Sequence, residues 1–368
     1  MQLPYSPQLN IPSLSRLFEN TSECYKLFWF QAILTKLENG QTSFTFEELV
    51  NEMIADAWYM VTEYHLNLGP KDTLEGVIKH ISDTTRFKPS EKKTVILEYL
   101  RTCTDKDVLK KKRDLIKNVP YRLQAPFMPE FKGREWKVSE RKLAEKINEK
   151  ERLMYYFSAF NGLHTELQLQ EDWVLYLSKN IEIIKGWAQY SMIKYLQKRN
   201  PNVPGILDKL HAPQERKLKR VIKYWQMIME VQPIYEIYNH QILTAKNLSI
   251  DHFVPWSYVA HDEFWNLHPT TKSINSKKSN HLPDWEIYFP LFGEQEYLSY
   301  QMLWKYEKIH DEFQTCSKEH LNSADIEYRL YREGQTREEF EEQLKEIILP
   351  VYESAKNSGF ENWVYRNE

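Results

Sequence analysis

The chain has 368 residues, which is enough for two or three domains, and 42% of its residues are hydrophobic, as in ordinary globular proteins. Its formal net charge is −3, which excludes a global basic field for nucleic acid, so any such binding must come from local patches. The scarcity of glycine, with 10 residues, argues against a loop-rich or all-β chain.

The first part of the chain predicts helices. Residues 25–37 have apolar positions on a helical period, and Asn39-Gly40 is a turn signal behind them. Thr45 and Glu48 form a capping box ahead of a helix over residues 49–61. Further helices are predicted from Asp72, from the capping residue Ser90 to Leu100, over 106–117 and over 139–150, with a break, a short strand or a linker at 120–129.

The second part also predicts helices, on both sides of a polar motif. A long amphipathic helix is predicted over residues 171–199, and another over 213–229 runs directly into the motif. After Pro290 the chain predicts helices again, most clearly over 294–313 and 337–355. The sequence therefore predicts a mainly α fold.

Cysteine usage and hydropathy favour a cytoplasmic protein. Cys24, Cys103 and Cys316 are isolated and show neither metal nor disulfide spacing, which is typical of a reducing compartment. No apolar run reaches the ~18 residues that a membrane-spanning helix needs, and the first residues lack the layout of a signal peptide. We therefore expect no membrane association.

Residues 194–223 carry nine basic residues against the two acids Asp208 and Glu215. Such a basic segment contacts phosphates without reading sequence, and it is the best candidate for a DNA-facing patch outside the motif. A solvated helix face explains the same pattern equally well. The candidate nucleic-acid-binding residues are Lys198, Arg199, Arg216, Lys217, Lys219, Arg220 and Lys223, with Lys277 from the motif.

The segment from Asp251 to Lys278 supplies the groups that phosphodiester hydrolysis needs. His252 is the candidate base, because an imidazole with a reference pKa of about 6.5 accepts a proton from water at neutral pH. Asp251 offers a carboxylate and Asn275 an amide oxygen, which are the hard ligands that Mg²⁺ prefers. Lys278 is a candidate point charge for a phosphate oxygen.

Residues 248–254 predict a short strand that Pro255 ends. Successive side chains on a strand point to opposite faces. A twist or bulge at the end of this strand would let Asp251 and His252 approach one phosphate from different sides.

The spacing of Asn275 and Lys278 predicts that both lie on one face of a helix. Ser273 is the candidate cap of this helix. A ligand on the first turn and a lysine one turn later would hold one phosphate from both sides.

The arrangement Asp-His-x-x-Pro-x-Ser, followed by Asn and nine positions later by Asn-x-x-Lys-Ser before a proline, resembles the HNH (ββα-metal) nuclease motif. It is similar in particular to stand-alone bacterial HNH nucleases and to the HNH domain of RNA-guided CRISPR nucleases. The resemblance covers roughly residues 230–290. The matching residues are Asp251, His252, Pro255, Ser257, Asn266, Asn275, Lys278, Ser279 and Pro283.

The resemblance implies a role for each polar residue. His252 is the general base, and Asp251 and Asn275 bind the metal ion, which is Mg²⁺ with Mn²⁺ as an alternative. Asn266 orients the loop that bears the base. Lys278 helps to bind or stabilise the scissile phosphate.

The sequence also bears on a structural zinc site and on a second metal site built from histidines. Many relatives bind a structural zinc through flanking cysteine pairs, but residues 235–240 contain no cysteine, so we expect no structural zinc. A second site built from His261, His268 and His281 is conceivable, although surface or phosphate-contacting histidines are the favoured interpretation. The aromatic residues expected to pack in place of the zinc are Tyr235, Tyr238, Trp256 and Trp265.

These observations predict three regions. Residues 1–225 are expected to be a helical region for sensing, docking or DNA binding, with a sub-boundary near 120–135. Residues 226–290 are expected to be an embedded HNH nuclease domain, and residues 291–368 a helical C-terminal segment.

The resemblance implies a metal-dependent endonuclease that cuts DNA, and a bacterial antiviral defence effector as its biological role. A homodimer or a co-encoded protein partner stays open, because one site cuts one strand. The alternatives are an RNase or a partner-gated nuclease that uses the same site, and a non-catalytic nucleic-acid-binding module that retains only the fold.

Overall fold

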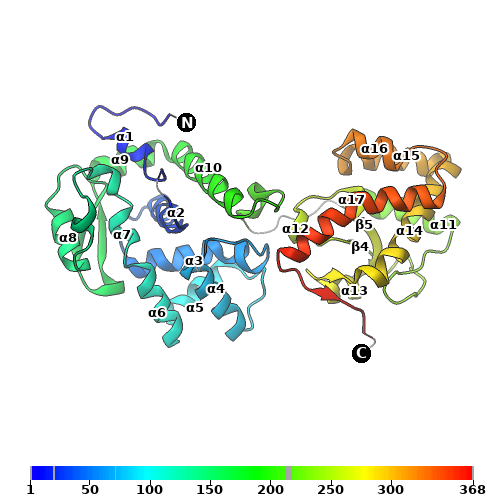
Figure 1. The fold of residues 1–368 in the computed structure, drawn as a ribbon, viewed down its shortest axis with the longest axis horizontal. Helices are drawn as coiled ribbons and strands as arrows, with labels where there is room; N and C mark the ends of the chain where they lie inside the picture. Colours follow the sequence, from blue (N-terminus) through cyan, green and yellow to red (C-terminus); the bar gives the residue numbers. More distant parts are fainter. Residues whose placement is uncertain (1, 20, 71, 212–217, 367–368) are drawn as a thin grey trace. The chain divides into compact units, whose positions relative to one another are not determined.

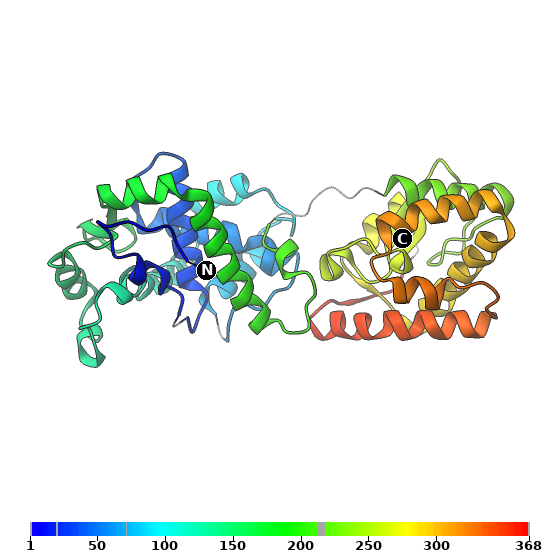
Figure 2. The same ribbon diagram turned by 90° about the horizontal axis from the view of Figure 1, so that it is seen from above.

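The structure is a computed structural model that describes residues 2–19, 21–70, 72–211 and 218–366. The chain folds as two compact units (Figures 1 and 2). Unit 1 comprises Met1–Pro201 with Leu210–Ala212, and unit 2 comprises Asn202–Lys209 with Pro213–Glu368. The segment expected to be the nuclease domain and the helices behind it therefore lie in one unit.

Unit 1 consists of helices and one small antiparallel sheet, whose strand order is β1-β3-β2. This confirms the mainly α fold expected for the chain. The helices are α1 Ile11–Ser15, α2 Tyr25–Glu38, α3 Phe46–Thr62, α4 Thr73–Thr84, α5 Lys93–Thr102, α6 Lys106–Leu115, α7 Val119–Arg122, α8 Glu140–Asn148, α9 Glu171–Lys179 and α10 Ile181–Arg199. The strands are β1 Ser43–Thr45, β2 Tyr155–Ala159 and β3 Glu166–Leu169.

The α3 helix forms the centre of unit 1 and packs against α2, α4 and α5. The predicted capping box is confirmed: the Thr45 hydroxyl accepts from the Glu48 N–H, and the Glu48 carboxylate accepts from the Thr45 N–H. This cap satisfies backbone donors at the helix start, which the chain needs because most residues of α3 are buried.

Two helix predictions in unit 1 are wrong in detail. The predicted helix over residues 171–199 is broken at Asn180, whose ψ of 20° leaves the helical range. The Asn180 side-chain amide donates to the Tyr176 carbonyl at 2.8 Å and so satisfies an acceptor at the end of α9. Ser90 does not cap α5, which begins at Lys93 behind Lys92.

Unit 2 contains the motif and a surrounding set of helices. The helices are α11 Lys219–Val231, α12 Trp256–Val259, α13 Lys272–Lys278, α14 Trp285–Lys305, α15 Glu307–His320, α16 Ala324–Leu330 and α17 Arg337–Asn357. The strands are β4 Leu248–His252, β5 Leu267–Thr271, β6 Leu282–Pro283 and β7 Asn362–Trp363. Short 3₁₀ turns cover Ile206–Lys209 and Phe264–Asn266 in this unit, and Ala125–Phe127, Gly133–Trp136 and Gly162–His164 in unit 1.

The β4 and β5 strands pair antiparallel, and α13 packs on both (Figure 1). α11 contacts both strands and packs on α15, while α14 packs on α15 and α17. The predicted helix over 294–313 is wrong, because the extended Tyr306 separates α14 from α15. Pro290 lies inside α14. None of the described helices combines the length and the apolar character needed to cross a membrane.

Glu296 on α14 makes the stability of unit 2 depend on pH. Its side chain is buried, and its Oε1 atom has no hydrogen-bond partner among the described residues. Burial raises the pKa of Glu296 well above its usual value of 4.5. The unfolded chain therefore releases this proton at a lower pH than the folded chain, so stability falls as pH rises from about 4.5 through the folded pKa.

We expect Glu296→Gln to reduce this loss, by up to about 1.4 kcal/mol for each pH unit in that window. Urea unfolding at about pH 5 and pH 8 measures the effect as a smaller fall in the free energy of unfolding than in the wild type. The matched control is Glu294→Gln on the exposed face of the same helix. An unchanged pH dependence in Glu296→Gln would contradict the assignment.

Candidate active site

The β4 strand places Asp251 and His252 at its C-terminal end. Its pairing with β5 is regular, with Asp251 opposite His268 and His252 opposite Leu267. The bulge that the sequence allowed is therefore absent from the pairing of β4 with β5. Both side chains are buried, and their adjacency on a strand places them on opposite faces of it.

His252 pairs with an acid that the sequence did not suggest. Its Nε2 atom lies 2.9 Å from Oδ1 of Asp262, and the imidazole is 1% exposed. Asp262 lies in the loop between α12 and the 3₁₀ turn Phe264–Asn266. A carboxylate at this distance fixes the orientation of an imidazole. The acids Asp262 and Glu263, which begin ten residues after His252, are the sequence feature that could have suggested this pairing. Acids are so common near turns that the feature is weak.

Asp251 is held by Lys278, which is fully buried. The Lys278 Nζ atom lies 3.0 Å from Asp251 Oδ2 and donates to the His252 carbonyl oxygen at 2.8 Å. Lys278 therefore bridges the two residues at the end of β4. The ammonium group is therefore buried beside Asp251 and does not project into solvent.

Electrostatics keep Asp251 ionised. Burial is the largest single influence and raises its pKa, but Lys278 and the nearby imidazoles together lower the pKa below the usual value. His268 lies 3.8 Å from the same carboxylate, and burial lowers its pKa to about 4, so its imidazole is neutral near pH 7. The site therefore contains one buried carboxylate and one buried ammonium as its charged centre.

Asn275 lies against β4, at the two residues that precede Asp251. Its side-chain nitrogen donates to the Ile250 carbonyl at 2.9 Å and to the Ser249 hydroxyl at 3.2 Å. The predicted cap of its helix is wrong: α13 starts after Thr271, whose hydroxyl accepts from the Ile274 N–H, and Ser273 lies inside the helix. The cap lies on the last residue of β5, which ties the helix to the sheet.

Asn266 fixes the backbone that follows His252. It is fully buried, its Oδ1 atom accepts from the Val254 N–H at 2.8 Å, and its Nδ2 atom donates to the Val254 carbonyl at 2.9 Å. The Asn266 carbonyl accepts from the Phe253 N–H at 2.9 Å. These bonds fix the backbone of residues 253 and 254, which directly follow His252, and the orienting role of Asn266 stays a prediction.

The residues near Asp251 fit a hard divalent cation. Asp251 supplies an ionised carboxylate whose buried Oδ2 atom lies 3.0 Å from the Lys278 ammonium and 3.8 Å from the His268 ring. Both recorded hydrogen bonds of Asn275 use its nitrogen, so its oxygen is the atom suited to a cation. An oxygen donor set of this kind is suited to Mg²⁺ or Mn²⁺.

The loop where relatives carry zinc-binding cysteines is organised by Glu236. Its buried carboxylate accepts from the N–H groups of Tyr238 and Asn239 at 2.7 and 2.9 Å and from the Thr270 hydroxyl at 2.9 Å. Tyr238 is buried, as expected for a packing residue, whereas Tyr235 is 56% exposed and does not pack there. A buried acid thus ties this loop to β5.

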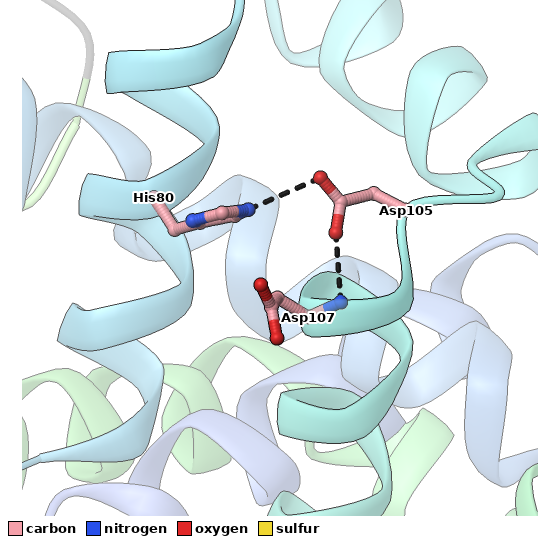
Figure 3. A group of neighbouring side chains, drawn as sticks. All are labelled: His80, Asp105 and Asp107. Carbon is pink, nitrogen blue, oxygen red and sulfur yellow. Dashed lines mark hydrogen bonds and ion pairs between the residues drawn. The ribbon is translucent and has the colours of Figure 1, made fainter.

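The disfavoured alternative, a second metal site built from His261, His268 and His281, does not form among the described residues. His268 is buried in β5 and is therefore neither a surface nor a phosphate-contacting residue. Among the described His, Cys, Asp and Glu side chains, the group close enough to hold an ion is in unit 1 and consists of His80, Asp105 and Asp107. Figure 3 shows His80 and Asp105 pointing toward one another. The His80 Nε2 and Asp105 Oδ2 atoms lie 3.1 Å apart, and Asp105 also caps α6.

The predicted basic patch is distributed over both units. Lys198 and Arg199 end α10 in unit 1, and the Arg199 guanidinium donates to the Tyr195 hydroxyl and the Ser22 carbonyl. Lys219, Arg220 and Lys223 lie on α11 in unit 2. Arg216 and Lys217 lie outside the described residues.

Acids on α15 offset two of the charges on α11. Arg220 pairs with Glu319 at 2.6 Å, and Lys223 pairs with Glu312. Lys219 is exposed at the start of the same helix. The DNA-binding role of this patch stays a prediction.

Comparison with known proteins agrees with this geometry. The family model for HNH endonuclease matches residues 235–284 and confirms the resemblance, although not the similarity to CRISPR nucleases. Searches of curated proteins and of solved structures found no match. HNH nucleases act on nucleic acids and are generally metal-dependent, so the match supports nuclease activity. The match includes His252, Asn266 and Asn275, so residues 235–284 are similar to the HNH endonucleases at the polar positions of the motif.

Proposed function

We propose that the chain is a metal-dependent endonuclease that hydrolyses phosphodiester bonds of DNA. The observation that supports this proposal most strongly is the position of Asp251 and His252 at the end of β4, with Asn275 hydrogen-bonded to the same strand and the Asp251 carboxylate paired with Lys278. A solvated polar cluster would not need a fully buried lysine to hold its acid.

His252 accepts the proton of the attacking water, and Asp262 fixes the ring for that transfer. Asn266 keeps the following turn in place. Asp251 and Asn275 hold the divalent cation, which stabilises charge on the phosphate and on the leaving 3′-oxygen when it is bound. Hydrolysis in this manner leaves 5′-phosphate and 3′-hydroxyl ends.

Asp262 gives a prediction that the sequence alone did not offer. Asp262→Asn is expected to lower kcat about 10- to 100-fold, because the amide no longer fixes the imidazole in one orientation. KM for DNA should stay within about twofold, since Asp262 contacts the base and not the substrate in this proposal. Asp262→Glu should restore part of the rate. Single-turnover cleavage measures both effects, and a wild-type rate in Asp262→Asn would reject this role.

The proposal is tested with the purified full chain on matched DNA and RNA, with Mg²⁺, with Mn²⁺ and with a chelator. Metal-dependent cleavage of DNA supports it, and cleavage restricted to RNA favours the RNase alternative. Plasmid substrate separates nicking by one site from linear product made by two copies. Absence of cleavage on both nucleic acids with both metals, also after addition of the co-encoded protein, would overturn the proposal.

The biological setting is proposed from the resemblance to stand-alone bacterial HNH nucleases. We infer a cytoplasmic defence effector in which unit 1 senses a trigger or docks a co-encoded protein. Restoration of cleavage by a co-encoded protein would identify the partner-gated form.

A further inference from the structure

The segment 361–366, here called the tail, is anchored to unit 2 next to the HNH segment. β7 pairs parallel with β6, and the Asp284 N–H donates to the Trp363 carbonyl at 2.9 Å. The Tyr365 N–H donates to the Tyr288 hydroxyl at 2.9 Å, and the Trp363 ring lies 5.0 Å from that of Tyr238. The tail is thus held by backbone pairing and aromatic packing, although it lies outside the match at 235–284.

A pocket of about 380 Å³ lies between the tail and the end of α13. Its lining combines basic groups with aromatic rings, and Glu361 is the one acid among the lining residues that the structure describes. We call this pocket the tail groove. It is lined by Lys277, His281, Glu361, Asn362, Trp363, Val364, Tyr365 and Arg366.

The basic and aromatic groups of the tail groove lie close together. Lys277 is exposed, and its Nζ atom lies 5.7 Å from the centre of the Tyr365 ring. Arg366 is exposed on the same tail. Basic groups beside an aromatic ring match the chemistry of a nucleic-acid strand, whose phosphates need cations and whose bases or sugars stack on rings.

The tail groove begins at the helix that supports the candidate active site. Lys278 on α13 turns inward to Asp251 and the His252 carbonyl, whereas its neighbour Lys277 lines the groove. The His281 ring is hydrogen-bonded to the Lys278 carbonyl at 2.8 Å, which connects the groove to the same turn. The tail groove and the candidate active site therefore both involve residues at the end of α13.

We infer that the tail groove binds the backbone of the nucleic-acid strand next to the scissile phosphate. Lys277 and Arg366 contact phosphates, and Tyr365 supports the adjoining nucleotide. A volume of about 380 Å³ suits one nucleotide rather than a duplex. The inference rests on the proposed function for the identity of the substrate, but it concerns binding rather than cleavage.

Binding is therefore measured on the full chain carrying His252→Ala, with single-stranded and duplex DNA at several salt concentrations. Adding Lys277→Ala and Arg366→Ala together should lower the slope of log affinity against log salt by about 1 to 2, because two phosphate contacts are lost. Tyr365→Ala should weaken binding about five- to 100-fold, and Tyr365→Phe should not.

Lys305 provides the matched control, because its Nζ atom lies 5.4 Å from the Tyr306 ring in the same unit but outside the tail groove. Lys305→Ala should leave the slope unchanged. Thermal unfolding of each variant shows whether the tail stays folded. An unchanged slope in the double variant, or no binding of DNA by the His252→Ala chain, overturns the inference. Cleavage by the wild type is read separately, so failure of the groove and failure of the nuclease proposal remain distinguishable.

Discussion

Replacing His252 with alanine is expected to lower kcat for DNA cleavage about 10²- to 10⁴-fold, which is the usual contribution of a general base. The imidazole is the group at the end of β4 that can accept a proton from water near neutral pH. Affinity for DNA should stay within about threefold, because the phosphate contacts come from other residues. Single-turnover cleavage and a binding titration on the same preparation measure the two effects.

His310→Ala is the matched control for this experiment, because His310 lies on α15, away from the end of β4 and outside the lining of the tail groove. It should retain a cleavage rate within about tenfold of the wild type. Thermal unfolding must show that the His252→Ala chain is folded. Unaltered cleavage by a folded His252→Ala chain would remove the imidazole from the mechanism.

Replacing Lys278 with methionine is expected to lower the free energy of unfolding of unit 2 by about 3–5 kcal/mol. The change leaves the buried Asp251 carboxylate without the ammonium 3.0 Å away, and it leaves the His252 carbonyl without its donor. Urea unfolding followed by tryptophan fluorescence measures the loss. Lys277→Met, one position earlier and exposed, should change the free energy by no more than about 0.5 kcal/mol.

A double substitution shows how much of the stability lost in Lys278→Met comes from leaving the Asp251 charge unpaired. Asp251→Asn combined with Lys278→Met removes both buried charges and should cost less than the sum of the single changes. If Lys278→Met unfolds at the same urea concentration as the wild type, the lysine lies in solvent and the bridging position is wrong. Because Lys278→Met is expected to destabilise unit 2, a loss of cleavage in this variant alone does not show that Lys278 contacts the phosphate.

Much of the fold could be predicted where local signals were strong. The capping box at Thr45 and Glu48 marks the start of α3 because both partners are three residues apart. Similar short-range reasoning failed at Ser90 and Ser273, where a nearby residue or the preceding strand sets the helix start. Serine is common near helix starts, and the sequence alone does not show which residue caps the helix.

Long-range partners could not be predicted from the sequence. β1 and β3 pair across more than a hundred residues, with Phe44 opposite Leu167, and both strands are very short. The pairing of Asp262 with His252 and the burial of Lys278 depend on loops and packing that no local pattern encodes. The motif identified the polar residues, but the structure was needed to show which contacts each one makes.

The stacking of Phe253 on Phe292 has a practical consequence for protein engineering. The two rings lie 4.5 Å apart, and Phe292 belongs to α14, outside residues 235–284. Tyr238 is likewise covered by Tyr288 and Trp363 from beyond that span. A transplant limited to the matching fifty-residue stretch would expose these rings to water. A transplanted HNH segment must therefore be accompanied by the rings of α14 and the tail that pack on it, which are Tyr288, Phe292 and Trp363.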